Sequence, residues 1–359
     1  MSVRYRVIAG KELDAALLGA WRAIQSKNSV FASPYFCPEF TQLAGEVRDD
    51  VRVVVIEDDD RIAGFFPHQR TLLGMGKPVG GPLSDYHGVI ADPGTNWEIE
   101  PLLRAAKLSV WSFNHLVDDT RKFDSHVQAR TTSPQIDLSS GYAQYAQGRR
   151  DSGSDYIRKT EGLARKLGRE AGELRFTLHE SGSEAIRQLI RWKSVQYREG
   201  RLPDVFAIPW TGDLLNRIAR TQSVDFAGVC SVLRVGDRMV AIHFGMRSAH
   251  VLHYWFPAYD PEFAKFSTGI ILLLRMAEAL AGTGLRTIDL GEGKSQYKER
   301  LMTGEVPLQK GSVELPSLLA TARRMQRVAE AYTAGSGMPT FFRMPFRAIR
   351  RIERTLKYR

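Results

Sequence analysis

The chain has 359 residues, 43% of them hydrophobic, and a formal net charge of +10. This length accommodates two domains or one large one, and no long low-complexity segment interrupts it. The N-terminal residues contain no apolar signal region, and no stretch approaches the roughly 18 apolar residues of a membrane span. We therefore expect a cytoplasmic protein with a sizeable core.

The cysteine and histidine content argues against a disulfide framework and against a metal centre. Cys37 and Cys230 lie far apart among apolar or aromatic neighbours, which favours buried free thiols. No Cys/His cluster has the spacing of a zinc site, so we predict no metal.

Basic residues concentrate in two segments, 149–169 and 343–359. Such clusters suit phosphates, anionic sugars, nucleic acid or anionic lipid, and equally a solvated surface. Within 345–358 the apolar residues fall on one helical side and the arginines elsewhere, which predicts a basic amphipathic helix.

Hydrophobic periodicity predicts alternating strands and helices along the chain. The first part reads as a strand at 3–8, a helix at 12–25, a hairpin at 51–66, a strand at 88–91, a helix at 98–110 and a strand at 112–116. The second part is helical at 142–171, 183–197, 213–220 and 270–281, with a strand at 174–179, a hairpin at 230–244 and strands at 251–256 and 286–290. This pattern predicts an α/β fold built on a mixed sheet.

The two hairpins are similar in sequence. Asp60-Arg61-Ile62-Ala63 matches Asp237-Arg238-Met239-Val240 almost position for position. Each hairpin follows a helical region and precedes a strand–helix–strand region. We interpret this as an internal duplication, although hairpins with a charged turn are common.

The segment 250–298 contains an aromatic strand, a polar turn and an almost wholly apolar helix. Amide hydrogens at the start of such a helix can hold a diphosphate, here at Ser267, Thr268, Gly269 and Ile270, with Lys265 as a counter-charge. The alternative is a capped, buried helix that binds nothing.

Several strings, in this order, resemble the CelD/BcsL-type (BioF2-like) acyltransferases. These form a branch of the GCN5-related N-acetyltransferase (GNAT) superfamily and are similar to the FemABX peptidyltransferases. The strings are FASPYFCPEF at 31–40, GGPLSDYHG at 80–88, WKSVQY at 192–197, AIHFG at 241–245, WFPAYD at 255–260 and DLGEGKSQYK at 289–298.

The resemblance implies tandem GNAT-like units, at 1–140 and 141–312, followed by a basic helical tail at 313–359. It also implies an acetyl-CoA or other acyl-CoA donor in the second unit. In this fold a splayed strand supplies backbone N–H groups to the thioester, here from Tyr254, Trp255 and Phe256. The superfamily's loop with two glycines is only partly present, since Gly269 stands alone.

Direct acyl transfer also needs a base, and the sequence offers several. Asp85 and His87 lie in a glycine-flanked polar loop, where turn chemistry is the alternative role. His243 and His253 lie in strands, where a packed histidine is commoner; we retain His243. Tyr259 and Asp260 follow the aromatic strand as an acid and its orienting group.

Substrate contacts are predicted near these candidates. The set comprises Tyr86, Lys193, Tyr197, Trp210, Glu292, Tyr297 and Lys298. The predicted activity is acyl transfer to a sugar or sugar-lipid precursor of a bacterial exopolysaccharide or cellulose-type polymer. The alternatives are a FemABX-like transferase that uses aminoacyl-tRNA, and a non-catalytic nucleotide sensor of a polysaccharide synthase. The basic tail would contact the inner face of the membrane, a synthase or a cyclic dinucleotide.

Overall fold

The structure is a computed structural model that describes residues 3–293, 295–317 and 321. The chain divides into two compact units. Unit 1 contains 3–27, 41–130 and the described residues from 309 on, and unit 2 contains 28–40 and 131–308. The division predicted from the sequence, at 140 and 312, stays a prediction.

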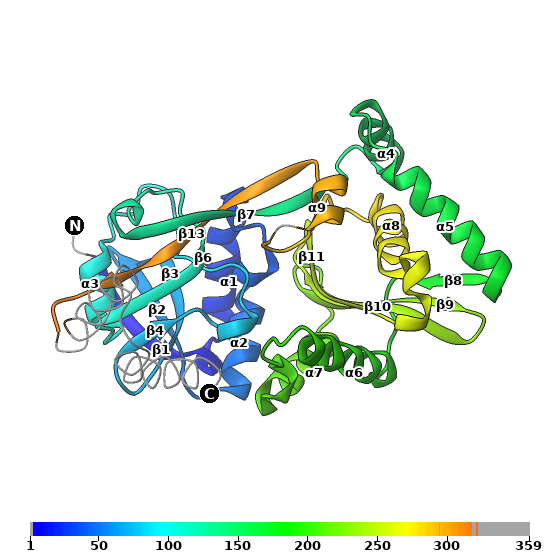
Figure 1. Ribbon diagram of the computed structural model, residues 1–359. Helices are drawn as coiled ribbons and strands as arrows, with labels where there is room; N and C mark the ends of the chain where they lie inside the picture. Colours follow the sequence, from blue (N-terminus) through cyan, green and yellow to red (C-terminus); the bar gives the residue numbers. More distant parts are fainter. Residues whose placement is uncertain (1–2, 294, 318–320, 322–359) are drawn as a thin grey trace, which may run out of the picture. The chain divides into compact units, whose positions relative to one another are not determined.

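Unit 1 is a sheet with helices on its faces (Figure 1). Its strands are hydrogen-bonded in the order β1-β2-β3-β4-β6-β13, and β5 pairs with β3 beside this path. The strands are β1 (Val3–Ala9), β2 (Val51–Asp58), β3 (Arg61–Arg70), β4 (Met75–Lys77), β5 (Ile90–Ala91), β6 (Val110–Leu116) and the end of β13 (Gly304–Glu314). The helices are α1 (Ala15–Gln25), most of α2 (Pro38–Val47) and α3 (Ile99–Ala105), with short 3-10 turns η1 (Gly10–Glu12), η4 (Gly81–Leu83) and η5 (Asp124–His126).

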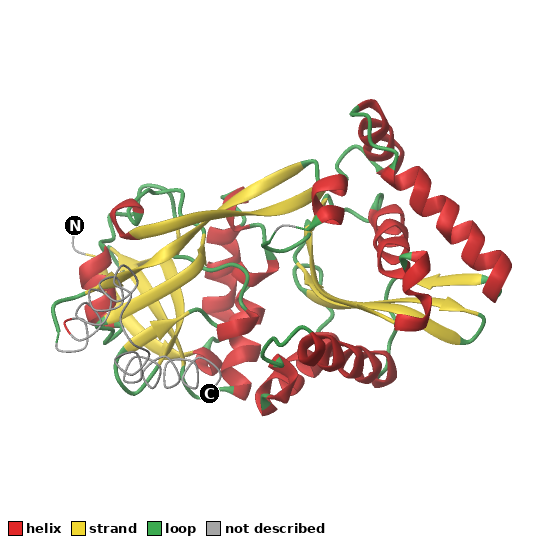
Figure 2. Ribbon diagram, viewed as in Figure 1, coloured by secondary structure: helices red, strands yellow, loops and turns green. Residues whose placement is uncertain are grey.

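Unit 2 has a sheet in the order β7-β12-β11-β10-β9-β8. Helices α8 and α5 cover one face, and α6 and α7 the other (Figures 1 and 2). The strands are β7 (Val127–Asp137), β8 (Leu174–Thr177), β9 (Ala227–Val235), β10 (Arg238–Arg247), β11 (Val251–Tyr259) and β12 (Thr287–Asp289). The helices are α4 (Tyr142–Asp151), α5 (Tyr156–Ala171), α6 (Ser183–Glu199), α7 (Pro209–Arg220), α8 (Thr268–Leu280) and α9 (Gln296–Leu301), with η2 (Ser29–Phe31), η3 (Pro34–Phe36), η6 (Val205–Ala207) and η7 (Pro261–Phe266).

Helix α8 lies at the centre of the unit 2 core. Its buried residues are Thr268, Ile271, Leu272, Leu273, Leu274, Met276, Ala277 and Leu280, eight of thirteen. A helix that is apolar nearly all round gains most when it packs between other elements, and α8 contacts β9, β10, β11 and α5. The predicted mixed α/β fold is confirmed.

The two units repeat the same order of elements. In unit 1 it is β1, α1, α2, β2, β3, β5, α3, β6, and in unit 2 it is β8, α6, α7, β9, β10, β11, α8, β12. In both, the first strand pairs antiparallel with the hairpin that follows the two helices. This correspondence supports the duplication inferred from the hairpins.

One ion pair is repeated at equivalent positions. In unit 1 the guanidinium of Arg61 binds Asp92, whose N–H donates to Ala63 O at 2.8 Å. In unit 2 the guanidinium of Arg238 binds Asp260, whose N–H donates to Val240 O at 3.0 Å. Because the same arginine–aspartate pair occurs in both units, we infer that it holds the start of the second hairpin strand against the end of the strand that follows.

The sequence missed β7 and most of β13. The stretch after Lys298 reads as an irregular glycine- and proline-containing segment, yet 304–314 is a strand of eleven residues. Its burial alternates irregularly, so the period-2 signal of a half-buried strand is weak. The predicted basic tail helix lies outside the described residues.

Within the described residues, no helix is both long enough and apolar enough to cross a membrane.

Candidate active site

Strands β11 and β12 separate in the middle of unit 2. They pair in parallel only at Val251–Thr287, Leu252–Ile288 and His253–Asp289. Strand β12 ends there, whereas β11 continues to Tyr259 along β10. From Tyr254 on, the edge of β11 that faced β12 therefore has no ladder partner among the described strands.

The free edge of β11 offers few backbone donors. Asp260 N donates to Val240 O on β10, so by alternation the amides of residues 258 and 256 also face β10. Residues 259 and 257 then face the open edge. Pro257 has no N–H, which is tolerated only at such an edge. The regular alternation leaves the N–H of Tyr259 as a donor there, and it ends at Phe256, so Trp255 lies where the register shifts.

A β-bulge marks the point of separation. Phe244 pairs with Phe256 and Met246 with His253, so Gly245 alone opposes Tyr254 and Trp255. A Cβ on Gly245 would lie 2.2 Å from the carbonyl oxygen of His253. Only glycine permits this close approach of the two backbones.

Helix α8 begins beside the open edge. Its N-cap residue, Ser267, has φ 55° and makes no side-chain cap. The N–H groups of Ile270 and Ile271 donate to Ser267 O, but those of Thr268 and Gly269 have no acceptor among the described residues. A Cβ on Gly269 would lie 3.6 Å from Tyr259 Cδ1, so the ring of Tyr259 lies next to this helix start.

At the last β11–β12 pair, an imidazole meets a carboxylate. His253 Nδ1 lies 3.3 Å from Asp289 Oδ1, and both side chains are buried. Asp289 also accepts from Ser133 Oγ at 2.7 Å, Gln135 Nε2 at 3.1 Å and Gly291 N at 2.8 Å. These donors orient the buried carboxylate. The 3.3 Å approach of His253 Nδ1 to Asp289 Oδ1 does not have the geometry of a hydrogen bond.

Tyr35 covers this pair. It comes from η3, and its ring packs edge-on against His253 at 5.0 Å and against Trp255 at 5.8 Å between centroids. Leu252 and Tyr254 belong to the core around α8, so by alternation His253 faces the other side of the sheet. The FASPYF string thus contributes directly to the surroundings of β11.

His243 differs from His253 in its surroundings. Its ring stacks on Tyr254 at 4.4 Å, and burial, with His253 nearby, lowers its pKa to about 3. Neither ring nitrogen of His243 has a hydrogen-bond partner among the described residues. A base whose conjugate acid is this strong takes a proton poorly at neutral pH.

The predicted acid and its orienting group, Tyr259 and Asp260, have other neighbours. Asp260 accepts from Arg238 at 2.6 Å and from Glu262 N at 3.1 Å, where it caps η7. Tyr259 is 41% exposed and lies beside α8, not beside the imidazole. We therefore assign neither a proton-transfer step.

Asp85, Tyr86 and His87 lie in unit 1. His87 Nε2 accepts from the N–H groups of Asn114 and His115, each at 3.3 Å. Burial, with His115 nearby, sets the pKa of His87 well below its usual value. The nitrogen that would take a proton is thus occupied by the backbone of β6. Asp85 is half-buried and Tyr86 is buried.

The remaining predicted contacts lie in unit 2. Lys265 pairs with Glu170 at 3.4 Å, and Lys298 donates to the carbonyls of Gly291 and Glu292, each at 2.9 Å, where it closes the loop. Glu292 accepts from Thr131 Oγ1 at 3.0 Å. Burial raises the pKa of Tyr297 to about 12. Trp210 is half-buried on α7.

Lys193 lies on α6, and its Nζ sits 5.4 Å from the centre of the Tyr197 ring. Burial lowers the pKa of Lys193 to about 8.

Among the described residues no group of three His, Cys, Asp or Glu side chains could hold a metal ion.

Comparison with known proteins identifies this arrangement. Residues 155–299 match the sequence family described as acetyltransferase (GNAT) domain. Unit 2 carries a GNAT-type acetyltransferase domain. The protein is therefore an acyltransferase, and GNAT domains use acyl-CoA as co-substrate. No curated protein matches the chain by sequence.

Three solved structures share the fold of this chain at 10% identity each. They are the C-terminal domain of a putative lysylphosphatidylglycerol synthetase from Agrobacterium fabrum (TM-score 0.52, covering 86% of this chain and 94% of that one), a tandem GNAT protein from the clavulanic acid biosynthesis pathway (0.51, 88% and 100%) and FemX (0.50, 77% and 90%). At this identity the similarity shows the fold alone.

The sequence did not single out Asp289, Ser133 or Gln135. Asp289 ends the short strand β12 just before a glycine loop, and a carboxylate at a buried strand position is rare enough to be a signal. Ser133 and Gln135 lie on β7, a strand that the sequence did not predict.

Proposed function

We propose that this GNAT-type protein transfers an acyl group from acyl-CoA to an amine or hydroxyl of a saccharide or sugar-lipid precursor of a bacterial exopolysaccharide or cellulose-type polymer. The observation that carries the proposal is the separation of β11 from β12 directly after His253 and Asp289. The CelD/BcsL-type resemblance supports the saccharide, and so do the aromatic side chains beside β11.

The donor would lie along the open edge of β11. The N–H of Trp255 would donate to the thioester carbonyl and to the oxyanion that forms there. The unpaired N–H groups of Thr268 and Gly269, at the positive end of α8, would hold the diphosphate. Both sets of hydrogen-bond donors are backbone N–H groups, so acyl-CoA could be bound here without a particular side chain.

His253 is the proposed base. The acceptor attacks the thioester carbon, and its proton passes to the imidazole, whose other nitrogen faces Asp289. The C–S bond then breaks, and the CoA thiolate takes the proton. Because Tyr35 shields the imidazole, water is kept from competing with the acceptor.

The described part of unit 1 offers no equivalent donor site. Helix α3 has only seven residues, with Glu98 at its cap and Glu100 in its first turn. These carboxylates oppose a diphosphate. Leu116 stands where unit 2 has Asp289, because His87 pairs with Leu116 as His253 pairs with Asp289.

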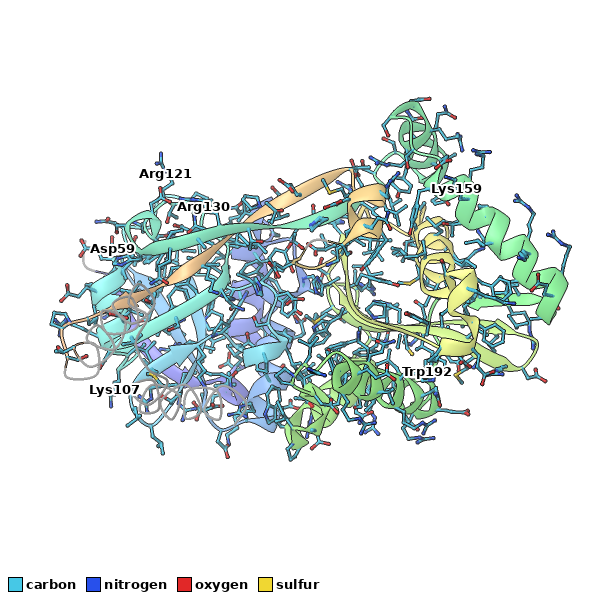
Figure 3. The ribbon with its side chains drawn as sticks, viewed as in Figure 1. Asp59, Lys107, Arg121, Arg130, Lys159 and Trp192 are labelled. Carbon is cyan, nitrogen blue, oxygen red and sulfur yellow. The ribbon has the colours of Figure 1, made fainter. Side chains whose placement is uncertain are left out.

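An aminoacyl-tRNA donor is the second candidate. FemX and the lysylphosphatidylglycerol synthetase domain share the fold, and α5 exposes five basic residues: Arg158, Lys159, Arg165, Lys166 and Arg169. Lys159 on α5 and Trp192 on α6 mark the two faces of unit 2 (Figure 3). However, Asp155 and Glu170 pair with three of these basic residues.

The proposals for the tail remain predictions. A contact with the membrane, a synthase or a cyclic dinucleotide would rest on 343–359, outside the described residues.

Calorimetric titration with acetyl-CoA tests the donor site. We expect one site per chain, and a Gly269→Trp variant should weaken binding by at least about tenfold because the indole fills the space over the first turn of α8. Gly269→Ala is the matched control, since its Cβ meets only Tyr259 Cδ1 at 3.6 Å. No binding of acetyl-CoA, together with salt-sensitive binding of charged tRNA, would instead support the second candidate.

A further inference from the structure

A row of aromatic rings leads from Lys193 to His253 within unit 2. Consecutive centroid distances are 6.3 Å for Tyr197–Phe206, 5.0 Å for Phe206–Phe256, 4.7 Å for Phe256–Trp255, 5.8 Å for Trp255–Tyr35 and 5.0 Å for Tyr35–His253. The row crosses α6, η6, β11 and η3.

Part of this row is accessible. Tyr197, Phe206 and Trp255 are half-buried, whereas Phe256 and Tyr35 lie beneath them with at most 4% of their surface exposed. The accessible rings can stack on the C–H face of a sugar, and the buried rings hold them in place. The free edge of β11 runs through the same residues.

The charged end of the row, the ammonium of Lys193, has an aromatic neighbour but no counter-charge in the described part of the chain. Among the described residues, no carboxylate lies within ion-pair distance of Lys193, whose Nζ contacts the face of Tyr197. An ammonium removed from water without a counter-charge is costly. A ligand with a negatively charged group beside Lys193 would offset this desolvation cost.

Other charged groups around α6 are already engaged. The elements packed against α6 are β9, β10, β11 and η6. The charged and titratable residues on these elements each have a neighbour of their own. Arg234 pairs with Glu180, Arg238 with Asp260 and His253 with Asp289, while Arg247 donates to backbone carbonyls, Asp204 accepts from the Phe206 N–H and His243 stacks on Tyr254.

We propose that the acceptor is an anionic sugar, whose ring stacks on Trp255 and Phe206 and whose carboxylate or phosphate binds Lys193. This rests on the proposed function and names its substrate class. It places the negative group at the α6 end of the row and the reacting hydroxyl or amine at the His253 end.

The test compares three probes by saturation-transfer NMR and calorimetry, with saturating CoA: glucuronate, glucose 1-phosphate and neutral glucose. At least one anion should bind about tenfold more tightly than glucose. The stronger of the two identifies a carboxylate or a phosphate. Lys193→Met should abolish the preference, Lys193→Arg should retain most of it, and Trp255→Ala should weaken all three probes alike.

The preference should also depend on pH. Lys193 is protonated below about pH 8, so affinity for the anion should be constant near pH 7 and fall as the pH rises past the lysine pKa, while affinity for glucose stays unchanged. This measurement needs no variant and holds even if Lys193→Met fails to fold.

Equal binding of glucose and both anions would overturn the inference, as would an anion preference that survives in Lys193→Met, or no binding of any probe. Acetyl-CoA titration of the same proteins without CoA separates the two failures. Binding of acetyl-CoA without an anion preference rejects only the anionic acceptor, whereas no binding of acetyl-CoA rejects the proposed function.

Discussion

Replacing His253 by glutamine is expected to lower kcat by about 10²- to 10⁴-fold, the usual contribution of a general base. The imidazole is buried at the last paired position before β11 leaves β12, next to the backbone N–H that would bind the thioester. Acetyl-CoA affinity should stay within about twofold, because the proposed site places the donor's diphosphate at the start of α8 and not at His253. Thiol release from acetyl-CoA with an anionic amino sugar such as glucosamine 6-phosphate as acceptor measures the loss.

Two further variants make this result specific. Asp289→Asn keeps the shape of the side chain but removes the charge opposite His253, and it should lower kcat without lowering donor affinity. His250→Gln is the matched control, since His250 is exposed just before the same strand. If His253→Gln retains full kcat while folded, the histidine is structural and the base lies elsewhere.

Gly245→Ala should destabilise the protein by about 1–3 kcal/mol or more, the range for overpacked sites. Its Cβ would lie 2.2 Å from His253 O and 2.7 Å from His243 Nε2, so the bulge that separates β11 from β12 would have to shift. Acetyl-CoA binding should weaken with it, because the N–H of Trp255 lies within this bulge. Chemical denaturation and calorimetry measure the two effects.

The control for this change is Gly212→Ala on α7. A Cβ there meets nothing within 4 Å, and alanine favours a helix over glycine by about 1 kcal/mol. Gly212→Ala should therefore be neutral or stabilising. Equal stability of Gly245→Ala and wild type would mean that the backbone at the bulge is looser than the structure shows.

The sequence predicted the fold because its signals are local and redundant. The hairpins, the apolar helix that became α8 and the aromatic strand that became β11 each have a clear period, and the repeated Asp-Arg turn disclosed the duplication. β7 and β13 lacked such a period, and α3 is shorter than the helical pattern at 98–110 because a strand begins at Val110.

The site was harder to predict because it depends on pairing between distant segments. Ser133, His253 and Asp289 come from three strands, and only the register of β11 on β12 brings the carboxylate beside the imidazole. Conversely, His87 and Asp260 were singled out from the sequence, yet both have structural hydrogen bonds. His87 accepts from backbone N–H groups of β6, and Asp260 accepts from the guanidinium of Arg238. A polar residue near a glycine cannot by itself show which of these roles it has.

The most direct test of the account follows backbone amides of ¹⁵N-tryptophan-labelled protein during titration with acetyl-CoA. The account predicts that the Trp255 amide shifts strongly and saturates at one equivalent, while the amides of Trp97 and Trp111 in unit 1 stay unchanged. Saturable binding that leaves the Trp255 amide unmoved would contradict it, because the donor would then not lie on the open edge of β11.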